Sequence, residues 1–244
     1  MAIAIIGCMD RRLNLFFENI RDKAESEGNG KVYVIRDAGG GIEAVKNTIA
    51  DLSITDIHDY THTNCGAMGV ALAACSKVHT GAKLDEVESS EDVYRTTVEP
   101  FLGGAYETPL AIEQKNTSVQ MEALSRMKTA HPELKTSCEL IEVEKLGVPK
   151  TDGEHTLVIG MAFSGKYSDI ARRYGLELHM AYFVQANHIE EIRPPVRLAV
   201  EKLGIKNVMF ISNERSEDDT INNWVADGEL GKVFGHQHVQ VHKP

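Results

Sequence analysis

Short runs of β-branched residues alternate with amphipathic segments along the first third of the chain. Residues 3–6 form a continuous apolar run that ends at Gly-Cys, which is typical of a buried parallel strand entering a loop. The segment that follows carries apolar residues at helical spacing and closes at Gly28, so it predicts a helix. Residues 31–41 and 56–66 repeat the strand pattern, with a helical pattern between them. This alternation predicts an α/β fold with a central, mainly parallel β-sheet and flanking helices.

Polar and thiol side chains follow each of these three predicted strands. Residues 8–10 (CMD) follow the first strand, residues 36–40 (RDAGG) the second and residues 62–65 (HTNC) the third. The carboxyl ends of parallel strands lie at one edge of a sheet, where open α/β proteins bind their ligands. We therefore expect the three loops to converge on one site.

The middle of the chain has a looser pattern. An acidic stretch after residue 80 is broken by Gly and Pro and predicts short helices and surface loops. A helix is then expected, with Asn116 or Thr117 near its cap and Pro132 after its end. We expect residues 81–150 to pack as a helical and loop segment on an α/β core formed by residues 1–80.

Residues 151–244 return to the alternating pattern and predict a further α/β segment. Strands are expected within 155–163, 176–185 and 205–213, and helices within 166–175 and 195–204.

The charge and hydropathy of the chain argue against several classes of partner. The 26 basic and 36 acidic residues give a formal net charge of -10, which disfavours general attraction to nucleic acid or anionic membrane. No apolar run approaches the roughly 20 residues that span a bilayer, and the opening residues do not resemble a signal peptide. We therefore expect a cytoplasmic protein whose four cysteines are free thiols or ligands.

Cys8, His62 and Cys65 form a candidate metal-ligand set at the predicted site. Zinc prefers thiolate and imidazole ligands in tetrahedral geometry, and a catalytic zinc keeps one position exchangeable. The His-x-x-Cys spacing allows His62 and Cys65 to come from one turn, while Cys8 approaches from a neighbouring strand end. Each cysteine taken singly could instead be an inert buried thiol.

Asp10 and Arg12 lie directly behind Cys8. Asp10 is close enough in sequence to reach the same metal, and Arg12 is close enough to form a charge-assisted pair with it. The acid could therefore open or close the metal site, or the two residues could form an ordinary structural ion pair.

Three linked motifs resemble those of the β-class carbonic anhydrases. Residues 8–12 (CMDRR) match Cys-x-Asp-x-Arg, residues 62–68 (HTNCGAM) match His-x-x-Cys-Gly, and residues 34–40 (VIRDAGG) are similar to Arg-Asn-Ala-Gly-Gly. The likeness covers residues 1 to about 75 and is greatest to the short archaeal- and mycobacterial-like branch. Asp37 stands where the family usually has asparagine.

The resemblance implies one zinc ion per chain, held by Cys8, His62 and Cys65, and a dyad of Asp10 and Arg12 that orients metal-bound hydroxide. The implied reaction is the reversible hydration of carbon dioxide to bicarbonate. Two alternatives stay open: a hydrolase of carbonyl sulfide or carbon disulfide on the same zinc scaffold, and a zinc-binding protein without turnover.

The last ninety or so residues are a weak echo of the first seventy-five. Residues 3–22 align with 156–175, and residues 45–66 align with 196–217. The aligned pairs at the candidate ligands are Cys8 with Met161, His62 with Asn213, and Cys65 with Ser216. A true repeat would have kept the fold and lost the ligands, although any two strand-helix-strand segments look alike. Because family members usually complete their pocket with a second subunit, we expect a homodimer or an internal pseudo-dimer.

The remaining candidates have plainer interpretations. Arg36 is expected either to bind an anion near the site or to pair with an acid. Cys75 and Cys138 are expected to be packing residues. The alternating histidines of residues 236–242 favour a solvated terminal strand or tail over a weak metal site.

Overall fold

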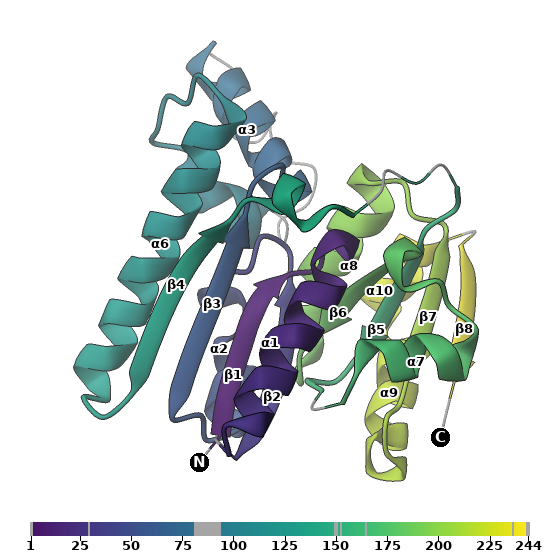
Figure 1. The fold of residues 1–244 in the computed structure, drawn as a ribbon. Coiled ribbons are helices and arrows are strands. Elements are labelled where there is room, and N and C mark those ends of the chain that lie inside the picture. The colour runs from purple at the N-terminus through teal and green to yellow at the C-terminus, as the bar shows by residue number, and fades with distance from the viewer. Residues whose placement is uncertain are drawn as a thin grey trace.

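One eight-stranded sheet with helices on both faces organises the chain (Figure 1). The structure is a computed structural model and describes residues 2–28, 30–80, 94–148, 151, 153–163, 165–235 and 237–242. Most of the acidic stretch expected to form short helices and loops, residues 81–93, lies outside the described residues. The expected α/β fold with a mainly parallel sheet is confirmed.

The strands follow the order β4-β3-β1-β2-β6-β5-β7-β8 across the sheet. They are β1 (Ala2–Cys8), β2 (Lys31–Asp37), β3 (Asp56–His62), β4 (Lys135–Ile141), β5 (Thr156–Gly160), β6 (Ala181–Gln185), β7 (Asn207–Ile211) and β8 (His238–His242). Neighbouring strands are parallel except at the centre, where β2 and β6 are antiparallel. The antiparallel junction divides the sheet into an N-terminal half, residues 2–148, and a C-terminal half, residues 151–242.

The helices that connect and cover these strands are α1 (Asn14–Ser26), α2 (Lys46–Asp51), α3 (Gly66–His79), α6 (Pro109–Ala130), α7 (Tyr167–Tyr174), α8 (Ile189–Arg197), α9 (Asp218–Val225) and α10 (Gly228–Phe234). Figure 1 shows α1 and α7 on one side of the sheet, with α2 and α8 behind it. Helix α1 ends near Gly28, as expected. Gly28 has a φ of 74°, a left-handed conformation that favours glycine.

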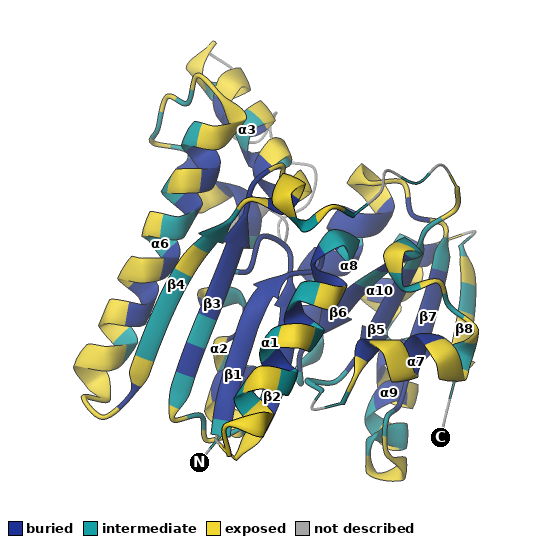
Figure 2. Ribbon diagram, viewed as in Figure 1, coloured by how far each residue is buried: buried dark blue, intermediate teal, exposed yellow. Residues whose placement is uncertain are grey.

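The strand order of the two halves is the same when each is followed outward from the centre. The order β2-β1-β3-β4 in one half corresponds to β6-β5-β7-β8 in the other. In the N-terminal half Ile3 pairs with Asp56, and in the C-terminal half Thr156 pairs with Asn207. Figure 2 shows that the central strands are the most completely buried, while β4 and β8 at the two edges are partly exposed.

The start of α6 differs from the expectation. The helix begins after Thr108, whose side chain accepts a hydrogen bond from the Ala111 N–H at 3.2 Å, with Pro109 in the first turn. Asn116 is therefore not a cap but a buried residue inside the helix. The end before Pro132 is as expected, because α6 stops at Ala130.

Two elements in the N-terminal half, α3 and β4, were not anticipated. β4 is half-buried along most of its length and does not alternate clearly between apolar and polar residues, so it carries no strong strand signal.

At the other edge of the sheet, β8 is the solvated strand that the alternating histidines favoured; His236 itself lies outside the described residues. No helix in the described ranges is long and apolar enough to cross a bilayer.

Asp59 is an unusual member of the core. It is fully buried on β3; its Oδ2 faces the Cys138 thiol at 3.3 Å and its Oδ1 has no hydrogen-bond partner. Burial raises the pKa of Asp59 to about 8, although the Cys138 thiol partly offsets the shift. The folded protein thus holds a neutral carboxyl group in its core at neutral pH.

The raised pKa of Asp59 predicts a pH-dependent loss of stability. The folded-state pKa of Asp59 lies above its unfolded value of about 3.9. The contribution of Asp59 to the free energy of unfolding is therefore fully present below that pH and is lost as the pH rises towards the folded-state pKa. The Asp59→Asn variant is expected to gain free energy of unfolding relative to wild type, by on the order of 1 kcal/mol per pH unit between about pH 5 and pH 7. Urea denaturation at several pH values measures this difference. The exposed Asp219→Asn variant is the control, and a constant difference for Asp59→Asn would contradict the prediction.

Candidate metal centre

Three candidate ligands from separate elements meet at one edge of the sheet. Cys8 ends β1, His62 ends β3, and Cys65 is the N-cap residue of α3. Their ligand atoms all lie within 4.8 Å of one another, and the three residues are 2–4% exposed. The strand ends thus converge as the sequence predicts.

The spacing and hydrogen bonding of these residues fit a zinc ion. The Cys8 and Cys65 sulfurs are 3.9 Å apart, and two thiolates on one tetrahedral zinc, with bonds of about 2.3 Å, lie about 3.8 Å apart. The Nδ1 of His62 lies 2.8 Å from the Thr63 carbonyl oxygen, which only accepts, so Nδ1 carries the proton. The Nε2 of His62 is buried and has no hydrogen-bond partner. An orphaned imidazole nitrogen beside two cysteines is the donor set that zinc prefers.

A hydrogen bond between the Cys8 and Cys65 sulfurs shifts the pKa values of both thiols. A hydrogen bond from Cys65 lowers the pKa of Cys8 well below its usual range, and the same bond raises that of Cys65. This bond favours the thiolate form of Cys8 over that of Cys65.

The turn that presents Cys65 has a left-handed residue at its tip. Asn64 has a φ of 53°, a conformation that asparagine tolerates better than most residues. Its carbonyl oxygen accepts a hydrogen bond of 2.7 Å from Nη2 of Arg12, and the Thr63 hydroxyl donates to Glu144 at 2.7 Å. The turn is thus attached both to the loop after β1 and to the segment after β4.

Asp10 and Arg12 form a two-point ion pair beside the cluster. Nε of Arg12 donates to Asp10 Oδ1 at 2.9 Å and Nη2 donates to Oδ2 at 2.6 Å, and the carboxylate also accepts from the Arg12 backbone N–H. Burial tends to raise the pKa of Asp10, but the hydrogen bonds and charge of Arg12, with the charge of His62, lower it overall. Asp10 is therefore ionised and held by Arg12.

The RDAGG loop is a packing turn against Cys8. The Gly39 N–H lies 3.4 Å from the Cys8 sulfur. Gly40 has a φ of 73°, and a Cβ there would stand 3.2 Å from the Gly7 Cα, so the close approach of the two chains requires glycine. Burial raises the pKa of Asp37 well above its usual range, which favours its neutral form.

Arg36 acts differently from either expectation. It is completely buried, and its donors reach the Cys8 carbonyl at 2.6 Å, the Asp10 carbonyl at 2.8 Å and Oδ1 of Asn14 at 3.1 Å. Its guanidinium carbon lies 4.6 Å from the Phe17 ring centre and 5.4 Å from that of Tyr167. Arg36 therefore holds the backbone on both sides of Met9 instead of binding an anion or pairing with an acid.

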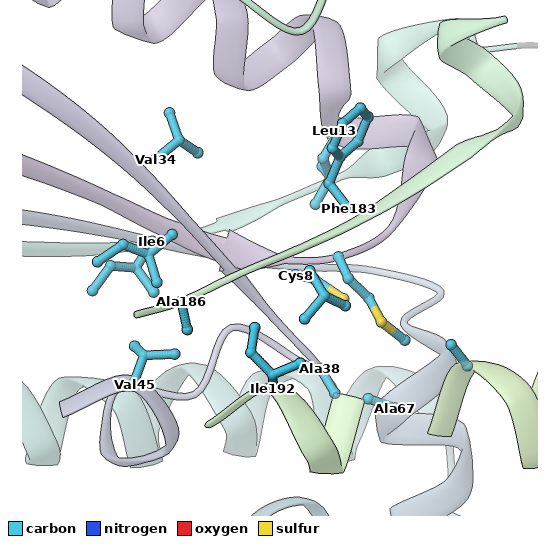
Figure 3. Close-up of a cluster of buried hydrophobic side chains, with 14 of the residues drawn as sticks. Ile6, Cys8, Leu13, Val34, Ala38, Val45, Ala67, Phe183, Ala186 and Ile192 are labelled. Carbon is cyan, nitrogen blue, oxygen red and sulfur yellow. The ribbon is translucent and has the colours of Figure 1, made fainter. Parts of the chain in front are cut away.

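The C-terminal half holds the same loop from the other side. The Phe183 N–H donates to the Met9 carbonyl at 3.2 Å, and Arg11 donates to the His179 carbonyl at 2.8 Å. Nδ2 of Asn14 is 2.8 Å from two carbonyl oxygens in the same region. Figure 3 shows Cys8 among buried side chains of both halves, including Ala38 and Ala67 of one and Phe183, Ala186 and Ile192 of the other.

Comparisons with known proteins give fold-level likenesses to carbonic anhydrases. No family model and no curated protein matches the chain. A β-carbonic anhydrase isoform of Trichomonas vaginalis is 21% identical with a TM-score of 0.37, over 58% of this chain and 77% of that one. A carbonic anhydrase of Glaciozyma antarctica is 22% identical with a TM-score of 0.36, over 59% and 78%. The β-carbonic anhydrase CcaA is 21% identical with a TM-score of 0.38, over 59% and 70%.

The sequence indicated the three candidate ligands and the acid and arginine beside them. It did not indicate Glu113, a buried residue of α6 that accepts a hydrogen bond of 3.1 Å from the Cys65 N–H. The available signal was the row of polar residues at positions 113, 116 and 120, which share one face of a helix.

Proposed function

We propose that this chain is a zinc-dependent carbonic anhydrase of the β class, which catalyses the reversible hydration of carbon dioxide to bicarbonate. The observation that carries the proposal is the buried Cys8–His62–Cys65 cluster, with its orphaned imidazole nitrogen and its sulfur spacing suited to tetrahedral zinc. Cys8, His62 and Cys65 would hold one zinc ion per chain. Asp10 and Arg12 would be the catalytic dyad.

Zinc bound in such a site supplies a water molecule whose pKa is lowered from about 15.7 to about 7, as in carbonic anhydrase. The ionised carboxylate of Asp10 only accepts hydrogen bonds, so it would orient a hydroxyl group beside the cluster through that group's proton. Arg12 fixes the carboxylate at two points and keeps it ionised.

Removing the charge of Asp10 tests the dyad. The Asp10→Asn variant is expected to keep one zinc per chain and to lose about 100-fold or more of its carbon dioxide hydration, a typical loss for a positioned acid-base group. Metal analysis and stopped-flow hydration of the same samples measure both quantities. The exposed Asp169→Asn variant is the matched control. Full activity in Asp10→Asn would contradict the assigned role.

The substrate is the finer part of the proposal, and a panel of carbon dioxide, carbonyl sulfide and carbon disulfide tests it. Hydration of carbon dioxide with little sulfide release supports a carbonic anhydrase. Sulfide release with little hydration would assign the same site to a hydrolase of carbonyl sulfide or carbon disulfide. A cytoplasmic location stays a prediction.

We also propose that residues 151–244 are a diverged second copy of the zinc-binding core, so that one chain is an internal pseudo-dimer. The support is the register of the strands. Ile3 aligns with Thr156 in sequence, and the strand partners of these residues, Asp56 and Asn207, are themselves an aligned pair. The copy has Met, Asn and Ser where the first has its ligands.

This second copy would replace a partner subunit. The C-terminal half already supplies the Phe183 and His179 contacts to the loop that carries Cys8 and Asp10. Because the second copy lacks zinc ligands, metal analysis is expected to find one zinc per chain. Two zinc ions per chain would contradict the proposed divergence.

A further inference from the structure

Helix α6 presents a row of three buried polar side chains to the metal centre. Glu113 is 3% exposed, Asn116 is 2% exposed and Gln120 is 6% exposed. Their spacing places them one above another on a single helix face. Buried polar groups destabilise a fold unless they are hydrogen-bonded, so the partners of this row indicate what it does.

The first member of the row holds the turn that carries Cys65. Oε1 of Glu113 accepts a hydrogen bond of 3.1 Å from the Cys65 N–H. Cys65 is the N-cap residue of α3, and its side chain makes no capping hydrogen bond. The Glu113 carboxylate therefore fixes the backbone of one metal ligand from outside the cluster.

The other two members hold the loop that faces Cys8. Nδ2 of Asn116 donates to the Gly39 carbonyl at 2.9 Å, and Nε2 of Gln120 donates to Asn116 Oδ1 at 2.9 Å. Oε1 of Gln120 accepts from the Ile42 N–H at 2.9 Å. Gly39 is the residue whose own N–H lies 3.4 Å from the Cys8 sulfur.

One rigid helix thus binds two of the three loops that converge on the metal centre. Glu113 acts on the loop of Cys65, and Asn116 acts through Gly39 on the surroundings of Cys8. The row therefore holds the segments beside both cysteines. The Cys8 and Cys65 sulfurs are 3.9 Å apart, a separation that suits tetrahedral zinc.

We propose that Glu113 and Asn116, braced by Gln120, are positioning residues that fix Cys8 and Cys65 at the spacing a zinc ion requires. The inference rests on the zinc-binding part of the proposed function and is independent of the substrate. Outer hydrogen bonds of this kind orient metal ligands, and their loss typically lowers metal affinity about 10- to 100-fold.

The test is the zinc affinity of three α6 variants, measured by competition with a chromophoric chelator. Glu113→Leu removes the acceptor for the Cys65 N–H and is expected to lower zinc affinity about 10- to 100-fold. Glu113→Gln keeps an acceptor oxygen and is expected to recover most of the wild-type affinity. The exposed neighbour Gln114→Leu is the control for an apolar substitution on α6 and is expected to match wild type.

The absorption of the cobalt-substituted proteins reports ligand geometry independently of affinity. Glu113→Leu is expected to change the sulfur-to-cobalt charge-transfer band, while Glu113→Gln retains it. If Glu113→Leu does not fold, Asn116→Ser gives the same comparison at the Gly39 end of the row, with the same expected loss of zinc affinity.

Wild-type zinc affinity in Glu113→Leu or in Asn116→Ser would overturn the inference, even if either variant melts at a lower temperature. Such a result would leave the row a purely structural feature and would leave the proposed function intact. A wild-type protein that binds no zinc would overturn the proposed function as well. The two failures are therefore distinguishable.

Discussion

Cys65→Ala is expected to lower zinc affinity by more than about 100-fold and to abolish carbon dioxide hydration. Even residues that only support a metal ligand change affinity by about 10- to 100-fold, and a missing ligand has a larger effect. Zinc cannot complete its preferred set of three protein ligands from Cys8 and His62 alone. Equilibrium dialysis against a zinc buffer, followed by metal analysis, measures the loss.

Cys75→Ala is the matched control for that experiment. Cys75 is also buried, but its sulfur contacts the Phe101 carbonyl oxygen at 3.4 Å and lies outside the metal cluster. This variant is expected to bind zinc as wild type does. Equal zinc affinities in Cys65→Ala and Cys75→Ala would rule out Cys65 as a ligand.

Arg36→Met is expected to destabilise the fold by about 3 kcal/mol or more. The substitution keeps an unbranched apolar chain but removes the donor to the Cys8 carbonyl and to the amide oxygen of Asn14, while the Asp10 carbonyl keeps only its bond from the Leu13 N–H. Each buried acceptor left unsatisfied costs about 1–3 kcal/mol. The contacts of the guanidinium with the rings of Phe17 in one half and Tyr167 in the other are also lost.

Chemical denaturation of the zinc-loaded protein measures this change in the free energy of unfolding. The control is Arg126→Met, because Arg126 makes an exposed ion pair of 3.1 Å with Glu43, and such pairs contribute about 0–1 kcal/mol. If the two variants lose the same stability, Arg36 does not hold the loop in the way that its hydrogen bonds indicate.

The candidate metal centre could be predicted from the sequence because its residues follow strands. The apolar run before Cys8 is a strong strand signal, a second strand is expected before His62, and the carboxyl ends of parallel strands meet at one edge of the sheet. The spacing of His62 and Cys65 then brings a third ligand into the same turn. These arguments needed no knowledge of how the remaining chain packs.

The supporting residues could not be predicted, because they act through backbone groups of distant segments. Arg36 donates to the carbonyl groups of Cys8 and Asp10, and a carbonyl acceptor is the same for every residue type. Asn116 has a side chain that favours helix caps, yet tertiary contact with Gly39 places it inside α6. Local preference and tertiary bonding conflict at this residue, and the tertiary bond prevails.

The relation between the two halves was visible in the sequence only as a faint alignment. The edge strands β4 and β8 lie beyond that alignment, but they extend the correspondence, since Asp56 pairs with Lys135 as Asn207 pairs with His238. Strand registers are maintained by backbone hydrogen bonds, so they do not depend on which side chains the two halves carry.

Stopped-flow carbon dioxide hydration by wild-type protein of measured zinc content is the most direct test of the proposed enzyme. The account predicts turnover in proportion to bound zinc, up to one zinc per chain, and loss of turnover when a chelator removes the metal. A protein fully loaded with zinc that hydrates no carbon dioxide between about pH 7 and pH 9, on either side of the typical pKa of zinc-bound water, would contradict it.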